Sequence, residues 1–174
     1  CIYRYHGTVD KYMGDAVMAF WGAPVDDPDH AEKAVCAAID MQQAVKRLSE
    51  RFVARGFPPV SIGVGINTGV VRVGDMGSKL RRAYTVIGDA VNLASRLEAL
   101  TKHYRIPIIV GEATQSSCPV RQFEPIDTVG VTGRQGAVQI FAPSETVSVT
   151  RPLPVSAVAA HTTRKADEAE SAGV

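Results

Sequence analysis

A lysine, a glycine and an aspartate lie close together in the run Lys11-Tyr12-Met13-Gly14-Asp15. Aromatic and aliphatic residues flank this run on both sides, at Ile2, Tyr3, Tyr5, Val17, Met18 and Phe20. The pattern predicts a β-hairpin whose tip carries the polar residues. Gly14 allows a sharp turn or a close approach to a ligand, Asp15 offers the hard oxygen that Mg²⁺ takes together with phosphate, and Lys11 is a mobile donor. Taken alone, the run is also compatible with a polar tip that does no chemistry.

A second polar group follows in residues 82–98, where a short strand is expected to turn at Gly88-Asp89 and continue as an amphipathic helix. Asp89 is expected to cap this helix. Asn92 and Arg96 are four residues apart and therefore share one face. An arginine binds phosphate oxygens with two parallel hydrogen bonds. Asn92 and Arg96 together therefore suit a phosphorus centre that gains negative charge during a reaction. The plainer alternative is that Arg96 pairs with a carboxylate and Asn92 is solvated.

Together these two segments resemble the catalytic domain of class III nucleotidyl cyclases, the adenylate and guanylate cyclases. Between them, the run from Ser61 to Gly69 and the run Gly74-Asp75-Met76-Gly77-Ser78 are similar to the central strand and glycine-rich arm of that family. The resemblance covers about Tyr3 to Phe141. It implies an α+β, ferredoxin-like βαββαβ domain with a central, mostly antiparallel sheet and helices packed on it. The family's first strand and helix are expected upstream of this chain.

The resemblance also implies a reaction and a set of roles. The family cyclises a nucleoside triphosphate by attack of the ribose 3′-hydroxyl on the α-phosphorus, with pyrophosphate leaving and two Mg²⁺ or Mn²⁺ ions assisting. Carried over to this chain, Asp15 is the second of two metal-binding aspartates. Asn92 orients the ribose, Arg96 stabilises charge at the α-phosphate, and Gly14 lets the backbone approach the substrate.

The same resemblance implies that Lys11 and Thr85 recognise the base of the nucleotide substrate. In adenylate cyclases a lysine meets a ring nitrogen of adenine, and an Asp or Thr accepts from the exocyclic amine. Guanylate cyclases generally carry an acid at the lysine position. The pair therefore implies ATP as substrate and cyclic AMP as product.

Two departures from the family pattern affect the site. The family's first metal aspartate lies on a strand upstream of this hairpin, and Asp10, Asp75 and Asp89 do not match its position. The fragment alone is therefore expected to be inactive. The second departure is Thr132-Gly133-Arg134, where many relatives have Lys-Gly-Lys. Arg134 is the candidate triphosphate contact there.

Class III cyclases build their sites between two catalytic domains, which implies a homodimer with two shared sites. Lys11 and Asp15 of one copy would then meet Asn92 and Arg96 of the other, and the arm in residues 70–82 is expected to reach across. A sensory or membrane segment is expected upstream in the parent chain. Three alternatives stay open: a non-catalytic cyclase-like module that dimerises and regulates a partner, a guanylate cyclase, and an unrelated α/β phosphate-binding domain.

Composition agrees with one packed domain, since 45% of the 174 residues are hydrophobic and 21% are charged. A formal charge of +1 argues against nucleic-acid binding. Three widely spaced cysteines favour free thiols in a reducing cytosol, where ATP is found. No apolar run approaches the roughly 20 residues that cross a bilayer, although the parent protein is still compatible with a membrane anchor.

The elements that would position these residues follow from periodicity and turn signals. A helix is predicted from Pro28 to Arg55, and a strand over residues 60–66 with 70–73 as its hairpin partner. Further elements are a strand at 106–110, a short helix at 112–118, and a closing hairpin of 123–131 with 137–141. By the resemblance, residues 1–143 are expected to form the partial cyclase domain. Residues 144–174 are rich in Ser, Thr, Ala and Pro and are predicted to be disordered.

Overall fold

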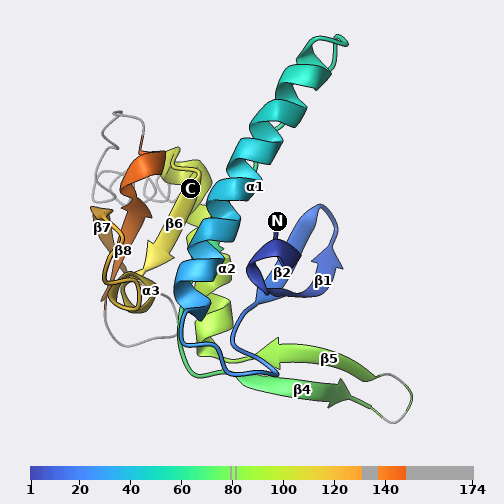
Figure 1. Cartoon of the computed structure of the whole chain (residues 1–174), viewed down its shortest axis with the longest axis vertical. Coiled ribbons are helices and arrows are strands. Elements are labelled where there is room, and N and C mark those ends of the chain that lie inside the picture. The colour runs from blue at the N-terminus through green and yellow to red at the C-terminus, as the bar shows by residue number, and fades with distance from the viewer. Residues whose placement is uncertain (79, 81, 131–136, 148–174) are drawn as a thin grey trace, which may run out of the picture.

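The computed structural model describes residues 1–78, 80, 82–130 and 137–147. Its helices and strands follow one another along the chain (Figure 1) as η1 (Tyr3–Tyr5), β1 (Thr8–Met13), β2 (Ala16–Phe20), α1 (His30–Val53), β3 (Val64–Ile66), β4 (Arg72–Gly77), β5 (Arg82–Ile87), α2 (Asp89–Tyr104), β6 (Ile108–Gly111), α3 (Glu112–Ser116), β7 (Phe123–Gly130), β8 (Ala137–Pro143) and η2 (Ser144–Thr146).

The main sheet has the strand order β3-β6-β8-β7. Strand β3 pairs with β6 in parallel, whereas β8 is antiparallel to both β6 and β7. The predicted α+β class with a mostly antiparallel central sheet is therefore confirmed. Two hairpins, β1–β2 and β4–β5, form separate two-stranded sheets, and in Figure 1 the long helices lie between them and strands β6, β7 and β8.

The long helices α1 and α2 pack on opposite faces of this sheet. Along β6, Ile108 and Val110 belong to the cluster that contains Val35 of α1, whereas Ile109 belongs to the cluster that contains Leu97 of α2. Successive residues of a strand point to opposite faces, so a strand covered on both sides is apolar throughout. For this reason the apolar run at 106–110 predicts a buried strand.

Helix α2 approaches the backbone of β3 very closely. A Cβ at Gly65 would lie 2.2 Å from the Glu98 nitrogen and 2.3 Å from the Ala94 oxygen, both in the backbone of α2. A Cβ at Gly63 would lie 1.9 Å from Thr101 Oγ1. Gly65 of β3 and Gly63 just before this strand therefore fix the distance between the sheet and the helix that carries Asn92 and Arg96.

Several predicted boundaries are corrected by the structure. Residues 3–5 form a 3-10 helix rather than a strand, so the first strand begins at Thr8. Of the predicted partner of the 60–66 strand, only residues 72 and 73 lie in a strand, and that strand, β4, pairs with β5. Helix α2 begins at Asp89 with Gly88 as its N-cap, and no side chain caps it.

The end of the described chain lies close to the predicted boundary at residue 143. Strand β8 ends at Pro143, and the 3-10 helix η2 follows directly. Val147, which falls in the predicted tail, packs against the core. The remainder of the proposed tail, 148–174, lies outside the described residues. Among the described helices, none combines the length and the apolar character that a bilayer span requires.

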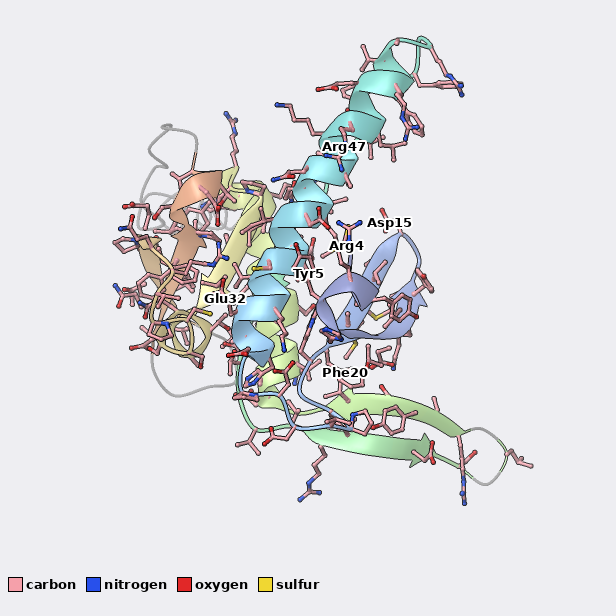
Figure 2. All side chains as sticks on the ribbon, viewed as in Figure 1. Arg4, Tyr5, Asp15, Phe20, Glu32 and Arg47 are labelled. Carbon is pink, nitrogen blue, oxygen red and sulfur yellow. The ribbon has the colours of Figure 1, made fainter. Side chains whose placement is uncertain are left out.

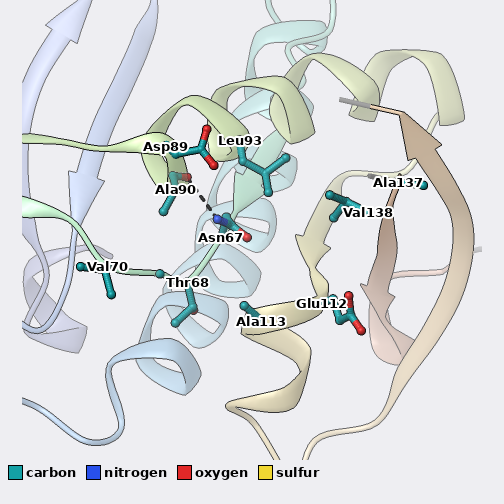
Figure 3. A pocket seen from close by; sticks show the side chains of 11 residues that line it. Asn67, Thr68, Val70, Asp89, Ala90, Leu93, Glu112, Ala113, Ala137 and Val138 are labelled. Atoms are coloured by element: carbon teal, nitrogen blue, oxygen red, sulfur yellow. Dashed lines mark hydrogen bonds between the residues drawn. The ribbon is translucent and has the colours of Figure 1, made fainter. Parts of the chain in front are cut away.

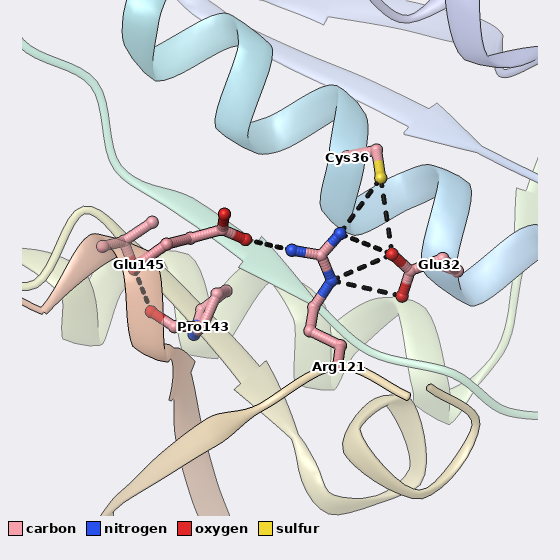
Figure 4. Close-up of polar contacts among 6 residues, drawn as sticks. Glu32, Cys36, Arg121, Pro143 and Glu145 are labelled. Carbon is pink, nitrogen blue, oxygen red and sulfur yellow. Dashed lines mark hydrogen bonds and ion pairs between the residues drawn. The ribbon is translucent and has the colours of Figure 1, made fainter. Parts of the chain in front are cut away.

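A half-buried arginine links the C-terminal end of the domain to α1 (Figure 4). Arg121 donates through Nε to both carboxylate oxygens of Glu32, at 3.0 and 3.2 Å, and through Nη2 to Cys36 Sγ at 3.2 Å. It also pairs with Glu145, which is more exposed. The hydrogen bonds to Glu32 contribute more to the stability of the fold than the pair with Glu145, because exposed ion pairs contribute little.

This pair is expected to make stability depend on pH. The hydrogen bond from Arg121 holds the pKa of Glu32 below its ordinary value of 4.5, against the opposing effect of burial. A lowered carboxyl pKa adds stability that is fully present above the ordinary value and is lost as the pH falls through the lowered pKa. Arg121→Met should therefore lower the free energy of unfolding at pH 7 by about 1–3 kcal/mol and weaken its fall below about pH 5. Urea unfolding at several pH values measures both effects, with the exposed-pair variant Glu145→Gln as a near-neutral control.

Candidate functional site

The predicted hairpin is present, and its tip carries the proposed metal ligand. Strands β1 and β2 are antiparallel, and Gly14 and Asp15 form the turn between them. Gly14 has φ +65°, a left-handed conformation that glycine adopts without strain. Asp15 is exposed at this tip and points away from the body of the molecule (Figure 2). Its carboxylate is thus free to meet a ligand or a second protein chain.

Lys11 and Thr85 lie side by side, although 74 residues separate them. Lys11 is on β1 and Thr85 is on β5, and Lys11 Nζ donates to Thr85 Oγ1 at 2.9 Å. The lysine side chain is 44% exposed, while Thr85 is buried. The structure thus brings together the two residues that the resemblance paired for base selection.

Asp10 joins this pair and was not predicted to be part of the site. Its Oδ2 accepts from Thr85 Oγ1 at 2.7 Å, and its Oδ1 lies 3.5 Å from Lys11 Nζ. Consecutive residues of a regular strand point to opposite faces, yet Asp10 and Lys11 both reach Thr85. The register of β1 shifts between Val9 and Lys11, so Asp10 is the extra residue of a β-bulge. A bulge has no clear signal in the sequence, which is why this residue was missed.

Contacts with β5 and with the N-terminal segment fix the position of this hairpin. The rings of Phe20 and Tyr84 have centroids 6.3 Å apart, which joins β2 to β5. On the other side, Trp21 Nε1 donates to the Tyr5 carbonyl at 2.9 Å. The N-terminal segment is in turn tied to α1, because Arg4 Nη1 donates to Asp40 Oδ2 at 2.6 Å. Figure 2 labels Arg4, Tyr5 and Phe20 next to the hairpin.

Asn92 and Arg96 lie on an exposed face of α2, next to the face that buries Leu93 and Leu97. Their side chains form no hydrogen bond or ion pair with any other residue that the structure describes. The simple alternative, in which Arg96 pairs with a carboxylate of the same chain, therefore has no support among those residues. Within one chain the structure does not join this pair to Lys11 or Asp15. Arg134 lies outside the described residues.

Asp15 is the site residue whose carboxylate suits a divalent metal ion. Among the described residues, no group of three or more His, Cys, Asp or Glu side chains is arranged to hold a metal ion. Mg²⁺, however, is commonly bound by one or two carboxylates together with substrate phosphates. An exposed carboxylate at a glycine turn fits one of those positions, and further ligands must come from outside the described residues.

A cavity of about 450 Å³ lies elsewhere, between the loop after β3 and the starts of α2, α3 and β8 (Figure 3). Asn67 Nδ2 donates across its wall to the Ala90 carbonyl at 3.2 Å. Asp89 and Glu112 both line the cavity, and their negative charges disfavour a triphosphate. None of the predicted site residues that the structure describes lines it. The candidate site is therefore an open surface of this chain rather than an internal pocket.

That surface carries several exposed apolar side chains. Tyr12, Met13 and Val17 of the β1–β2 hairpin are 75%, 51% and 48% exposed, and Tyr84 and Ile87 of β5 are also exposed. Apolar residues gathered next to a charged site are typical of a surface that another protein covers.

Comparison with known proteins agrees with this arrangement. Residues 4–142 match the family model described as the adenylate and guanylate cyclase catalytic domain. The chain belongs to this family. Adenylate cyclase 1 of Rhizobium meliloti (strain 1021) is 36% identical over 148 residues, which cover 84% of this chain but 22% of that protein.

Solved cyclase structures are similar in fold. The adenylyl cyclase CyaB from P. aeruginosa aligns with a TM-score of 0.74 and 34% identity, covering 87% of this chain and 76% of that one. The guanylyl cyclase Cya2 aligns with the same TM-score and 30% identity, over the same shares of the two chains. The predicted family and fold are therefore confirmed. Because both an adenylyl and a guanylyl cyclase are similar to this domain, similarity of fold does not determine whether the substrate carries adenine or guanine.

Proposed function

We propose that this domain is the catalytic domain of an adenylate cyclase, which converts ATP into 3′,5′-cyclic AMP and pyrophosphate. The observation that carries the proposal is the contact between Lys11 and Thr85 at 2.9 Å. It places an ammonium donor next to a hydroxyl acceptor, and adenine presents the complementary edge: a ring-nitrogen acceptor beside an amine. The named adenylate cyclase relative supports the same substrate.

The proposed roles follow from charge and exposure. Asp15 would hold a divalent metal that neutralises phosphate charge, and Gly14 gives the turn that presents this carboxylate. Arg96 binds oxygens at the α-phosphate as negative charge develops, and Asn92 orients the ribose. Two Mg²⁺ or Mn²⁺ ions, when bound, would lower the pKa of the attacking hydroxyl and neutralise the phosphates. Arg134 is proposed as a contact for the triphosphate.

A homodimer completes the proposed site. Lys11 and Asp15 lie on the β1–β2 hairpin and Asn92 and Arg96 on an exposed face of α2, and no hydrogen bond or ion pair joins the two sets in the described part of one chain. A symmetric dimer presents the same surface from both copies. The hairpin residues of each copy would then meet the α2 residues of the other copy, which gives two sites. The exposed apolar residues of the hairpin and β5 support such an interface. The parent chain is proposed to add an upstream sensory or membrane segment and to hold this domain in the cytosol.

Turnover of competing nucleotides tests the proposed substrate. The full-length protein, given equal concentrations of ATP and GTP with Mn²⁺ or Mg²⁺, is expected to form cyclic AMP at least about tenfold faster than cyclic GMP. Chromatography of the products measures the ratio. Preferential formation of cyclic GMP would support a guanylate cyclase instead, and formation of neither product would support the non-catalytic regulatory module.

A further inference from the structure

Asp10 is a buried charged residue to which the proposed chemistry assigns no role. Its side chain is 1% exposed. Oδ2 accepts from Thr85 Oγ1 at 2.7 Å and, over 3.4 Å, from the backbone nitrogen of Val86. Oδ1 is buried without a hydrogen-bond partner among the described residues, 3.5 Å from Lys11 Nζ. Burial of a carboxylate costs free energy, so we expect a buried carboxylate next to the two base-selecting residues to have a role there.

The hydrogen bonds at Thr85 fix the direction of its hydroxyl proton. A threonine hydroxyl has one proton and two lone pairs. A carboxylate only accepts, so the proton of Thr85 is directed to Asp10. An ammonium only donates, so Lys11 occupies one lone pair of the same oxygen. One lone pair remains, and toward a bound base Thr85 can therefore only accept.

We propose that Asp10 is a positioning residue for base selection, which acts through Thr85 by holding its hydroxyl as an obligatory acceptor. This inference rests on the proposed function. An obligatory acceptor favours a base with an amino group at position 6, which donates, and disfavours a 6-oxo group, which only accepts. Without Asp10 the hydroxyl could rotate and donate to a 6-oxo group. The bulge in β1 is what brings Asp10 and Lys11 to the same threonine.

The variant Asp10→Asn tests this role while it preserves the size of the side chain. The amide NH₂ is repelled by the Lys11 ammonium, so the amide oxygen is expected to turn to Lys11 and the NH₂ to Thr85. Thr85 would then accept from the amide and could donate to a ligand. In the full-length protein, the ratio of kcat/KM for ATP to that for GTP is expected to fall about 10- to 100-fold. Asp26→Asn, which changes an exposed aspartate before α1, is the matched control and should leave the ratio unchanged.

A second variant separates a role through Thr85 from a general effect of the buried charge. Thr85→Val removes the hydroxyl and should also lower the ratio. If Asp10 acts through that hydroxyl, Asp10→Asn added to Thr85→Val changes the ratio no further. An unchanged ratio in Asp10→Asn, or equal effects of this substitution with and without Thr85, would overturn the inference.

A test with the unaltered protein does not depend on the folding of a variant. In the triphosphate of 6-methoxypurine riboside, the ring nitrogen still accepts, but the group at position 6 has no proton to donate. An obligatory acceptor at Thr85 predicts that this nucleotide is used no better than the unsubstituted purine nucleotide. Clearly better use of the methoxy compound would contradict the role of Asp10 even if ATP turnover is normal. If the unaltered protein forms no cyclic nucleotide at all, the proposed function is itself contradicted, and this inference with it.

Discussion

Asp15→Asn in the full-length protein is expected to lower kcat for formation of cyclic AMP by about 10³-fold or more. Asp15 is the exposed carboxylate at the hairpin tip, and the proposal gives it a metal ion shared with the phosphates of ATP. Such an ion stabilises the transition state by several kcal/mol, and each 1.4 kcal/mol corresponds to a factor of ten in rate. An asparagine keeps the size and one oxygen but loses the charge, so the metal would be held poorly.

Steady-state rates with Mg²⁺ and with Mn²⁺ measure this effect. Asp26→Asn is again the matched control, because it removes an exposed aspartate outside the site. Thermal unfolding of the two variants should be similar, since both positions are exposed. Wild-type turnover in Asp15→Asn, with either metal, would remove Asp15 from the proposed site.

Arg96→Ala is expected to lower kcat by about 10²- to 10³-fold, the usual effect of removing one preorganised donor to a developing negative charge. The effect on KM should be much smaller, because the proposed contact strengthens in the transition state. Arg96→Lys keeps the charge but loses the two parallel donors, so its rate should fall between those of the wild type and the alanine variant.

Arg47→Ala provides the control for this series, since Arg47 is an exposed arginine on the other long helix (Figure 2). Helix α2 is fixed by Leu93 and Leu97 on its buried side, so the loss of Arg96 should leave stability nearly unchanged. A large rise in KM with unchanged kcat would mean that Arg96 binds substrate and transition state equally. In that case its proposed role at the α-phosphate would be wrong.

Local patterns in the sequence were sufficient to predict most of the elements. The apolar run of β6, the turn signals around Gly14 and Gly88, and the spacing of α1 and α2 all concern neighbouring residues. The errors came where distant contacts decide the structure. Residues 3–5 are β-rich but form a 3-10 helix packed against α1, with Arg4 bound to Asp40.

The candidate site could likewise be predicted only in part from the sequence. The resemblance named Lys11 and Thr85 as a pair, and the structure brings them together. Asp10 could not be found in this way, because its role depends on a bulge that places two consecutive residues on one side of a strand. The proposed partners of Lys11 and Asp15 on α2 remain a prediction, since one chain does not bring them together.

Mixing two inactive variants of the full-length protein tests the shared adenylate cyclase site most directly. Asp15→Asn damages the hairpin set and Arg96→Ala damages the α2 set, so a mixed dimer has one site with both defects and one intact site. When the two proteins exchange subunits at equal concentration, half of the dimers are mixed, and formation of cyclic AMP should recover to about a quarter of the wild-type rate. A mixture that stays as inactive as its two components, although subunits exchange, would contradict a site shared between Asp15 of one copy and Arg96 of the other.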